Sequence, residues 1–300
     1  TSVVEYRGKE KVLISDRVYN LHRFVENFSG ARLSSWLDDE GNVIKEESPA
    51  GFVFLRESEY KAKSMPGKSA ELLSAVSVAA KGGMVALDGR SQISYRLTLP
   101  TDGEFDLDGG RQQVSGDIVT ITMENLPKDS SLELTPCSGA DGTLDASPYI
   151  QSDSPAIIEK SREITNGLTS NRLQASAISN WVYTSLEKRP VIGIPDALTT
   201  LENLVGDCNE HASLFAALAR AAGIPTKIAA GVVYYKNAFY YHAWNEVCLS
   251  GRWISLDTTR DQFPADLSHI KFIEGELQQQ VRIGALIGTL EIEPLPEDQQ

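Results

Sequence analysis

The segment Gly206-Asp-Cys-Asn-Glu-His-Ala212 has the composition of a helix start that carries a reactive thiol. Asp207 is a favourable N-cap residue, and Glu210, three positions later, fits the second half of a capping box. A helix that begins here places Cys208 in its first turn, where the helix dipole and unpaired N–H groups favour a thiolate. The same N–H groups can receive an oxyanion. A buried cysteine acting as a small apolar side chain is the usual alternative, but the downstream residues favour a nucleophile.

Two downstream segments supply a base and an acid. Residues 241–246 (YHAWNE) are predicted to form a strand that carries His242, and residues 252–257 (RWISLD) a shorter strand that ends on Asp257. We expect adjacent antiparallel strands to place Asp257 beside His242, where the carboxylate orients the imidazole and favours its charged form. His242 then deprotonates Cys208.

Several motifs in this order resemble the core of the transglutaminase-like superfamily: Gly206-Asp-Cys208, Gly223-Ile-Pro225, His242-Ala-Trp244, Glu246, and Trp253 through Asp257-Thr-Thr259. The resemblance covers residues 173–272, about a third of the chain. It implies a papain-like fold with Cys208 as nucleophile, His242 as base and Asp257 as the orienting acid.

The resemblance also suggests residues that contact substrate. The family places an aromatic or amide side chain near the oxyanion, before the cysteine, and Trp181 is one candidate. Tyr241 and Trp244, which flank His242, are candidates for substrate contact, although packing explains such aromatic residues equally well. Nothing in the sequence resembles the calcium sites or additional β-sandwiches of animal transglutaminases.

The first half of the chain is typical of strands and turns. Asp38-Asp-Glu-Gly41 is a turn signal, and residues 69–80 fit either a helix or a strand. Strand-forming residues are concentrated in residues 19–25, 32–37, 93–99 and 118–123. We therefore expect residues 1–150 to form a mainly antiparallel, β-rich accessory domain.

The pattern changes near residue 150. Helices are expected from Ser154-Pro155 to Gly167, from Ser170 to Leu186 and from Cys208 to Gly223, and strands over residues 226–235, 239–249 and 253–256. Residues 191–205 are expected to be a loop. Residues 151–300 are thus predicted to be a transglutaminase-like, papain-like catalytic domain of helices packed on an antiparallel sheet. The fold class is α+β.

Composition limits the partners. The chain of 300 residues has 28 Lys and Arg against 41 Asp and Glu, a net charge of −13. Without a basic stripe, such a chain repels nucleic acid and anionic membranes. No uninterrupted apolar stretch is long enough to predict a transmembrane helix. No cofactor is expected, and Cys208 with His211 lacks the second pair of ligands that a zinc site needs. The oligomeric state stays open.

The remaining cysteines and histidines are given structural interpretations. Of Cys137, Cys208 and Cys248, at most one pair can form a disulfide, so at least one thiol stays free. Cys248 is interpreted as an apolar filler and Cys137 as a loop thiol. His22 and His269 are isolated in the sequence and are interpreted as solvated or structural.

The leading hypothesis is a cysteine-dependent acyl-transfer enzyme that acts on amide or peptide bonds through a thioester. Hydrolysis is favoured over transfer to an amine, since water is always available. The alternative is a non-catalytic module that binds a peptide or a partner; such modules normally lose a triad member, and none is lost here. Residues 1–150 are expected to bind or position substrate without contributing a chemical group.

The cellular location is predicted from the resemblance. The whole chain resembles bacterial two-domain proteins of this superfamily that are typically exported. It opens on Thr1 without a signal-peptide core, as expected of a processed or trimmed form. We expect an exported, periplasmic or cell-envelope protein, with the cytoplasm as the alternative.

Overall fold

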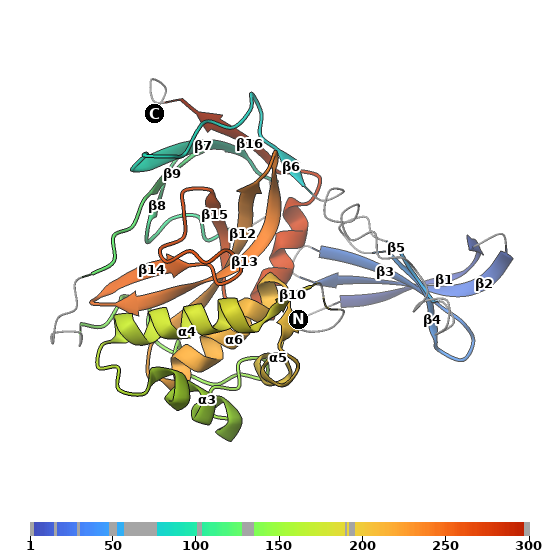
Figure 1. The fold of residues 1–300 in the computed structure, drawn as a ribbon. Coiled ribbons are helices and arrows are strands. Elements are labelled where there is room, and N and C mark those ends of the chain that lie inside the picture. The colour runs from blue at the N-terminus through green and yellow to red at the C-terminus, as the bar shows by residue number, and fades with distance from the viewer. Residues whose placement is uncertain are drawn as a thin grey trace. The chain divides into compact units, whose positions relative to one another are not determined.

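A computed structural model describes most of the chain (Figure 1). The described residues are 3–14, 17–28, 31–47, 53–56, 77–100, 104–127, 135–189, 191 and 196–296. They belong to two compact units. The first comprises residues 1–78, 98–104 and 281–290, and the second comprises residues 79–97, 105–280 and 291–300.

The first unit contains an antiparallel sheet with strand order β1-β2-β3-β4-β5. Its strands are β1 (Val3–Ile14), β2 (Arg17–Phe28), β3 (Ala31–Leu37), β4 (Val43–Glu47) and β5 (Val53–Leu55). The Asp38 carboxylate accepts a hydrogen bond from the Asn42 N–H at 2.7 Å in the turn between β3 and β4. Ile14, Leu21 and Trp36 form a small core. The predicted antiparallel β region at the N-terminus is confirmed.

A second sheet belongs to the other unit, with strand order β16-β7-β9-β8, and its strands β7, β9 and β8 pair antiparallel. Its strands are β16 (Glu291–Leu295), β7 (Gln92–Thr98), β9 (Ile118–Thr122) and β8 (Gln112–Ser115). Alternate residues face one side of a strand, and on that side Ile93, Tyr95 and Ile121 are fully buried. The Tyr95 hydroxyl donates to the Leu267 carbonyl at 3.0 Å. This sheet therefore packs against residues from the second half of the chain.

The compact units do not divide at residue 150. Ile150 is fully buried in the same core as Ile157 and Ile178, so the chain around it is interior rather than linker. The sheet of β7, β8 and β9 precedes residue 150 but belongs to the second unit. The predicted domains 1–150 and 151–300 stay a prediction, and the compact units group the residues differently.

The second unit also holds helices that precede a larger antiparallel sheet in the sequence, and this sheet has the strand order β14-β13-β12-β15. The helices are α3 (Pro155–Thr165), α4 (Asn171–Ser185), α5 (Ala197–Asn203) and α6 (Cys208–Ala221), and the strands are β12 (Thr226–Tyr235), β13 (Ala238–Leu249), β14 (Arg252–Leu256) and β15 (His269–Glu274). The predicted core of helices on an antiparallel sheet is confirmed (Figure 1).

Helix α6 occupies the centre of this unit. It contacts β12 and β13 as well as α3, α4 and α5. Every residue from Glu210 to Arg220 is buried, so the helix has no solvent-facing side. Ala216, Ala217 and Ala219 allow neighbouring elements to approach closely. The first turn of α6 is thereby held by the core of the molecule.

The expected loop over residues 191–205 is partly wrong. Residues 197–203 form α5, whose N-cap Asp196 accepts a hydrogen bond from the Thr199 N–H at 3.0 Å. Ala197 and Thr200 are buried, so packing stabilises a helix too short to show a clear period in the sequence. Two short strands flank it, β10 (Glu187–Lys188) and β11 (Val205–Gly206), paired in parallel.

The interpretation of Cys137 and Cys248 as unpaired is wrong. They form a disulfide with a Cα–Cα distance of 5.8 Å, which joins the segment around residue 137 to β13. Their separation of 111 residues gave no sequence signal for the pairing.

Of the ambiguous residues 69–80, residues 69–76 lie outside the described residues, and Val78–Ala79 form β6. The remaining elements are α7 (Leu277–Gln280) and the 3₁₀ helix η1 (Val281–Leu286).

Candidate active site

Cys208 lies at the N-terminus of α6 and is the free cysteine of the chain. The predicted capping box is present: the Asp207 carboxylate accepts from the Asn209 N–H at 3.1 Å, and Glu210 accepts from the Asp207 N–H at 2.9 Å. A Cβ atom at Gly206 would lie 2.2 Å from the Glu210 Cβ, so only glycine fits before the cap. Burial, followed by the contact with Asp207, raises the pKa of Glu210 to about 7.

His242 and Asp257 meet across β13 and the end of β14. His242 Nε2 lies 2.8 Å from Asp257 Oδ2, and the Asp257 side chain is only 1% exposed. Thr259 Oγ1 lies 3.2 Å from the same nitrogen. The Asp257 backbone also pairs with Gln262, which fixes the chain where β14 ends. The structure thus brings the predicted base and acid together.

The electrostatics of the pair favour a charged imidazole. Burial lowers the pKa of His242, but the charges of Asp257 and Cys208, and hydrogen bonds to both, raise it to about 9. Burial raises the pKa of Asp257, but His242 and then His269 outweigh it and hold that pKa well below its usual range. Because Nε2 faces the carboxylate, Nδ1 is left for the thiol. His242 is therefore protonated near neutral pH, with Asp257 as the partner of Nε2.

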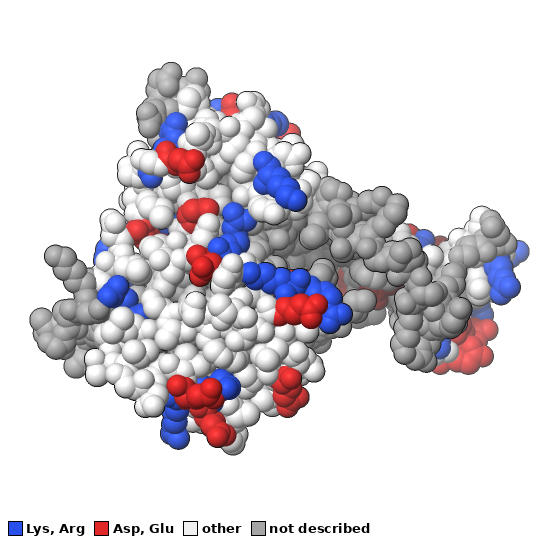
Figure 2. All heavy atoms as spheres, in the orientation of Figure 1, with Lys and Arg blue, Asp and Glu red and all other residues white. Residues whose placement is uncertain are grey.

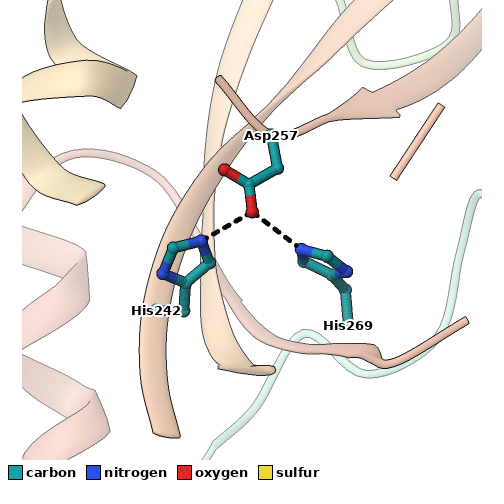
Figure 3. Close-up of side chains that lie close together, drawn as sticks. All are labelled: His242, Asp257 and His269. Carbon is teal, nitrogen blue, oxygen red and sulfur yellow. Dashed lines mark hydrogen bonds and ion pairs between the residues drawn. The ribbon is translucent and has the colours of Figure 1, made fainter. Parts of the chain in front are cut away.

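Of the two interpretations of His269, solvated or structural, the first is wrong. Its side chain is fully buried, with Nε2 3.1 Å from Asp257 Oδ2 and Nδ1 3.0 Å from Asp266 Oδ1. Figure 3 shows one Asp257 oxygen between the two imidazole rings. Burial lowers the pKa of His269, but hydrogen bonds to Asp257 and Asp266 raise it overall. The pair Asp266-x-x-His269 was the available sequence signal, and it matches no recognised motif.

Trp244 supports both imidazoles from within the sheet. Its ring stacks on His242 with a centroid distance of 6.3 Å and meets His269 edge-on at 5.2 Å. Trp244 is 2% exposed. A Cβ at Gly231 would lie 3.0 Å from Trp244 Cη2 and 2.0 Å from the Ile270 carbonyl oxygen, so β12 carries glycine here. These contacts make Trp244 a packing partner of the two histidines.

The other two candidates for substrate contact, Tyr241 and Trp181, have no described side-chain interaction with Cys208, His242 or Asp257. The Tyr241 hydroxyl is buried, with no hydrogen-bond partner among the described residues. Burial raises the pKa of Tyr241, so the phenol keeps its proton. Trp181 lies on α4 beneath the Lys160 ammonium, 5.4 Å from the ring centroid, and packs against the core. None of the interactions described for Trp181 joins it to Cys208, His242 or Asp257.

A second histidine of α6 connects the start of the helix to the acid. His211 is fully buried, and its Nδ1 lies 3.1 Å from the carbonyl oxygen of Thr258, next to Asp257. Burial, then the charge of Lys188, lowers the pKa of His211 to about 4. The ring is therefore neutral, and Nδ1 donates to the carbonyl. This bond ties the helix of Cys208 to the segment of Asp257.

Part of the first half of the chain holds the loop after β14. The buried Arg111 guanidinium donates to the carbonyl oxygens of Ala265, at 2.5 Å, of Asp266, and of His269, at 3.3 Å. Glu124 lies 3.6 Å from the same guanidinium. Residues that precede β8 and follow β9 therefore position the backbone that carries Asp266 and His269.

Glu246, which the motifs also contain, forms a buried ion pair. Lys271 Nζ lies 2.9 Å from both Glu246 carboxylate oxygens, and both residues are more than nine-tenths buried. Lys271 is two residues beyond His269 on β15. The pair fixes β13 against β15 beside the two histidines, since breaking one partner would leave an uncompensated buried charge.

One group of ligating side chains among the described residues could hold a metal ion. The ligand atoms of His242, Asp257 and His269 lie within 4.8 Å of one another. Hydrogen bonds already connect these atoms through Asp257 Oδ2. A cation would have to replace the protons of both bonds, so the arrangement fits a hydrogen-bonded cluster better than a metal site.

The described surface mixes both signs of charge. Acidic and basic side chains are interspersed on the face drawn in Figure 2. Examples are the pairs Lys81–Glu291, Arg96–Glu293 and Lys160–Glu163. None of the helices in the described part of the chain combines the length and hydropathy needed to cross a lipid bilayer.

Comparisons with known proteins agree with the motifs. A family model of the transglutaminase-like superfamily matches residues 158–258. No curated protein matches the chain in sequence.

Three solved structures are among those to which this chain is similar. A protein from Cytophaga hutchinsonii described as a candidate cysteine protease is 20% identical, with a TM-score of 0.43 over 67% of this chain and 83% of its own. The periplasmic domain of TgpA from Pseudomonas aeruginosa is 16% identical, with a TM-score of 0.41 over 62% and 75%. Red sea bream transglutaminase is 11% identical, with a TM-score of 0.27 over 84% and 41%. The family model and the motifs carry the assignment: residues 158–258 of this chain form a transglutaminase-like superfamily domain.

Proposed function

We propose that this chain is a cysteine hydrolase that cleaves amide or peptide bonds, with Cys208 as nucleophile, His242 as acid and base, and Asp257 as orienting acid. The superfamily domain supports a cysteine-dependent enzyme in general. The observation that carries the finer proposal is the buried contact of 2.8 Å between His242 and Asp257, while the charge of Cys208 at the start of α6 acts on the same imidazole. A single imidazole thus connects a nucleophile with a buried carboxylate.

The reaction proceeds in two halves. In the first, the Cys208 sulfur bonds to the carbonyl carbon, and the oxyanion is stabilised by N–H groups at the start of α6. The C–N bond then breaks as His242 gives its proton to the leaving amine, and a thioester remains. In the second half, water bonds to the thioester carbon while His242 takes the proton of that water. The C–S bond breaks, the acid product leaves, and the thiolate and imidazolium are restored.

The same site can pass the acyl group to an amine. Transamidation requires an amine in place of water in the second half of the reaction. The balance between hydrolysis and transamidation depends on how well the site excludes water. We propose hydrolysis because water needs no binding site of its own. A peptide or protein substrate supplies the amide.

We also propose that the protein works outside the cytoplasm, in the periplasm or cell envelope. The Cys137–Cys248 disulfide supports this, since disulfides persist in oxidising compartments and are rare in the cytosol.

Labelling and peptide cleavage test the proposal together. Iodoacetamide should alkylate Cys208 well below pH 8, as located by mass spectrometry, because the nucleophile of the proposed mechanism has to be reactive. A library of unstructured peptides should be cleaved by the wild type and left intact by Cys208→Ala. Adding a primary amine should leave the products as free acids. Amine adducts would replace hydrolysis by transamidation, and a peptide that binds without turnover to an unreactive thiol would favour the binding module.

A further inference from the structure

His269 lies between two carboxylates. Its Nε2 faces Asp257 at 3.1 Å and its Nδ1 faces Asp266 at 3.0 Å. An ionised carboxylate only accepts hydrogen bonds, whereas a neutral imidazole has one donor and one acceptor nitrogen. Both nitrogens of His269 therefore have to be donors. With both carboxylates ionised, as their lowered pKa values indicate, this geometry makes the fully buried ring an imidazolium.

We propose that His269 is a permanently charged positioning residue that fixes the Asp257 carboxylate and limits the basicity of His242. The inference rests on the proposed function in one respect, that His242 is the base. His269 acts through Asp257 and has no contact with substrate. Asp266 is the counter-charge that keeps the second proton on His269.

Both carboxylates are held in place from other directions. Asp257 Oδ1 accepts from the Thr259 N–H at 2.8 Å, which leaves Oδ2 to be shared by the two imidazoles. Asp266 accepts from Gln262 Nε2 at 2.7 Å and from the Ser268 N–H at 2.9 Å. Neither carboxylate can turn away from His269 without breaking these bonds.

The charged groups around the cluster have opposing effects on His242. The carboxylate of Asp257 stabilises its positive charge, and the thiol of Cys208 acts in the same direction. The imidazolium of His269 opposes both, with ring centroids 5.9 Å apart. Arg260 Nε lies 3.9 Å from Asp257 Oδ2 and has the same sign as His269.

Other charged residues near the cluster act at a distance. Lys188 interacts with Asp257 through its charge. Arg111 contacts the cluster through carbonyl oxygens, including that of His269. Neither separates the two imidazoles from the carboxylate between them.

A cation in this position has a chemical use. A base paired with a buried carboxylate alone would hold its proton too tightly to give it to a leaving amine. By sharing the Asp257 oxygen, His269 removes part of that stabilisation while the hydrogen bond still orients His242. The predicted consequence is a fall in the pKa of His242 relative to a site without the second ring.

Titration of the histidines by NMR tests this directly, because the chain has only four: His22, His211, His242 and His269. Nitrogen-15 shifts should show both His269 nitrogens protonated from pH 5 to beyond pH 8. One bare nitrogen on His269, or a midpoint between pH 5 and 8, would overturn the proposal.

Three variants sharpen the test. His269→Gln keeps an N–H donor towards Asp257 but removes the charge. Coulomb's law at 5.9 Å with an effective dielectric constant of ~20 then gives a rise of about two pH units in the pKa of His242. Asp266→Asn keeps the ring in place and should lower the pKa of His269. His22→Gln, which alters an exposed histidine of the first unit, should change neither value.

The outcomes separate this proposal from the proposed function. An unchanged pKa of His242 in His269→Gln would refute the role of the charge whether or not the protein cleaves peptides. If His269→Gln fails to fold, the pKa of His269 in Asp266→Asn tests the proposal instead. A fall in that pKa supports a cation paired with Asp266, and an unchanged pKa refutes it. A protonated His269 in a protein whose Cys208 proves inert would leave the pairing intact and remove only the function.

Discussion

Two of the His–Asp pairs in the described part of the chain have almost equal lengths and very different surroundings. In the first unit, His22 Nε2 lies 2.9 Å from Asp39 Oδ1, with side chains 32% and 67% exposed. In the second, His242 and Asp257 are 2.8 Å apart, with side chains 12% and 1% exposed. Water and Lys9, whose Nζ lies 2.5 Å from Asp39, compete for the first carboxylate. Distance alone therefore does not distinguish a functional pair.

Burial and third partners make the difference. Hydrogen bonds from Lys9, then His22, lower the pKa of Asp39, but solvent screens this exposed pair and its contribution to stability is small. No solvent reaches Asp257 to replace a lost hydrogen-bond partner, and its Oδ2 atom contacts two imidazole rings. Breaking the buried pair leaves a charge without compensation, so its loss should affect both stability and chemistry. The predictions below compare the two pairs.

The largest effect is expected from the nucleophile. Cys208→Ala should abolish both alkylation and peptide cleavage, because no other free thiol is present. Intact-mass spectrometry after iodoacetamide and a peptide-cleavage assay measure these outcomes. An undiminished cleavage rate in the variant would refute the mechanism.

The second-largest effect is expected from the comparison of Asp257→Asn with Asp39→Asn. Asp257→Asn should lower kcat/KM for peptide cleavage by about 10²–10⁴-fold and leave more activity than Cys208→Ala, since a Cys–His pair remains. Asp257→Asn should also destabilise the fold by about 3 kcal/mol in chemical denaturation, because it leaves His242 without its charge partner. The matched variant Asp39→Asn should leave both quantities unchanged. Similar losses of kcat/KM and of stability in Asp257→Asn and Asp39→Asn would mean that burial does not distinguish a functional His–Asp pair from a surface pair.

The disulfide should affect stability more than chemistry. Replacing Cys137 and Cys248 together by Ser should lower the free energy of unfolding by about 2–5 kcal/mol, because the bond closes a long loop. Cys208 would be the only remaining thiol, and its alkylation rate at low temperature should stay within about twofold of wild type. A large drop in that rate would show that the bond also positions His242, which shares β13 with Cys248.

The smallest effect is a dependence of stability on pH. The pKa of His242 rises from 6.5 to about 9 on folding, so its contribution is fully present below pH 6.5 and is lost as the pH rises through about 9. The melting temperature should therefore fall between pH 7 and pH 10, and His242→Gln should flatten this part of the curve. His22→Gln should leave it unchanged. A wild-type curve that rises over this range would contradict the sign.

Much of the fold could be predicted from local patterns. The start of α6 was readable because the cap, the capping-box glutamate and the preceding glycine are contiguous in sequence. The strands β12, β13 and β14 follow each other with short turns, so their pairing and the contact of Asp257 with His242 followed from alternation. The antiparallel N-terminal sheet was likewise visible in its strand-forming residues.

What the sequence did not reveal depends on distant segments. His269 pairs with Asp257 only because β15 returns beside β12, and nothing near residue 269 indicates that neighbour. The disulfide joins residues 111 apart. Helix α5 is stabilised by tertiary packing. Arg111 is separated from two of its carbonyl partners by more than 150 residues in the sequence. Each of these is a tertiary contact with no local signature.

The complete burial of α6 has a consequence for how substrates are selected. A helix that is buried from Glu210 to Arg220 can change neither its tilt nor its register without disturbing β12, β13 and the other helices, so the backbone of Cys208 has essentially one position in space. The ordering of the nucleophile is therefore completed during folding and adds no entropic cost to the encounter. In this chain, adaptation to different substrates is therefore left to the segments around the helix terminus, because the packed helix itself cannot yield.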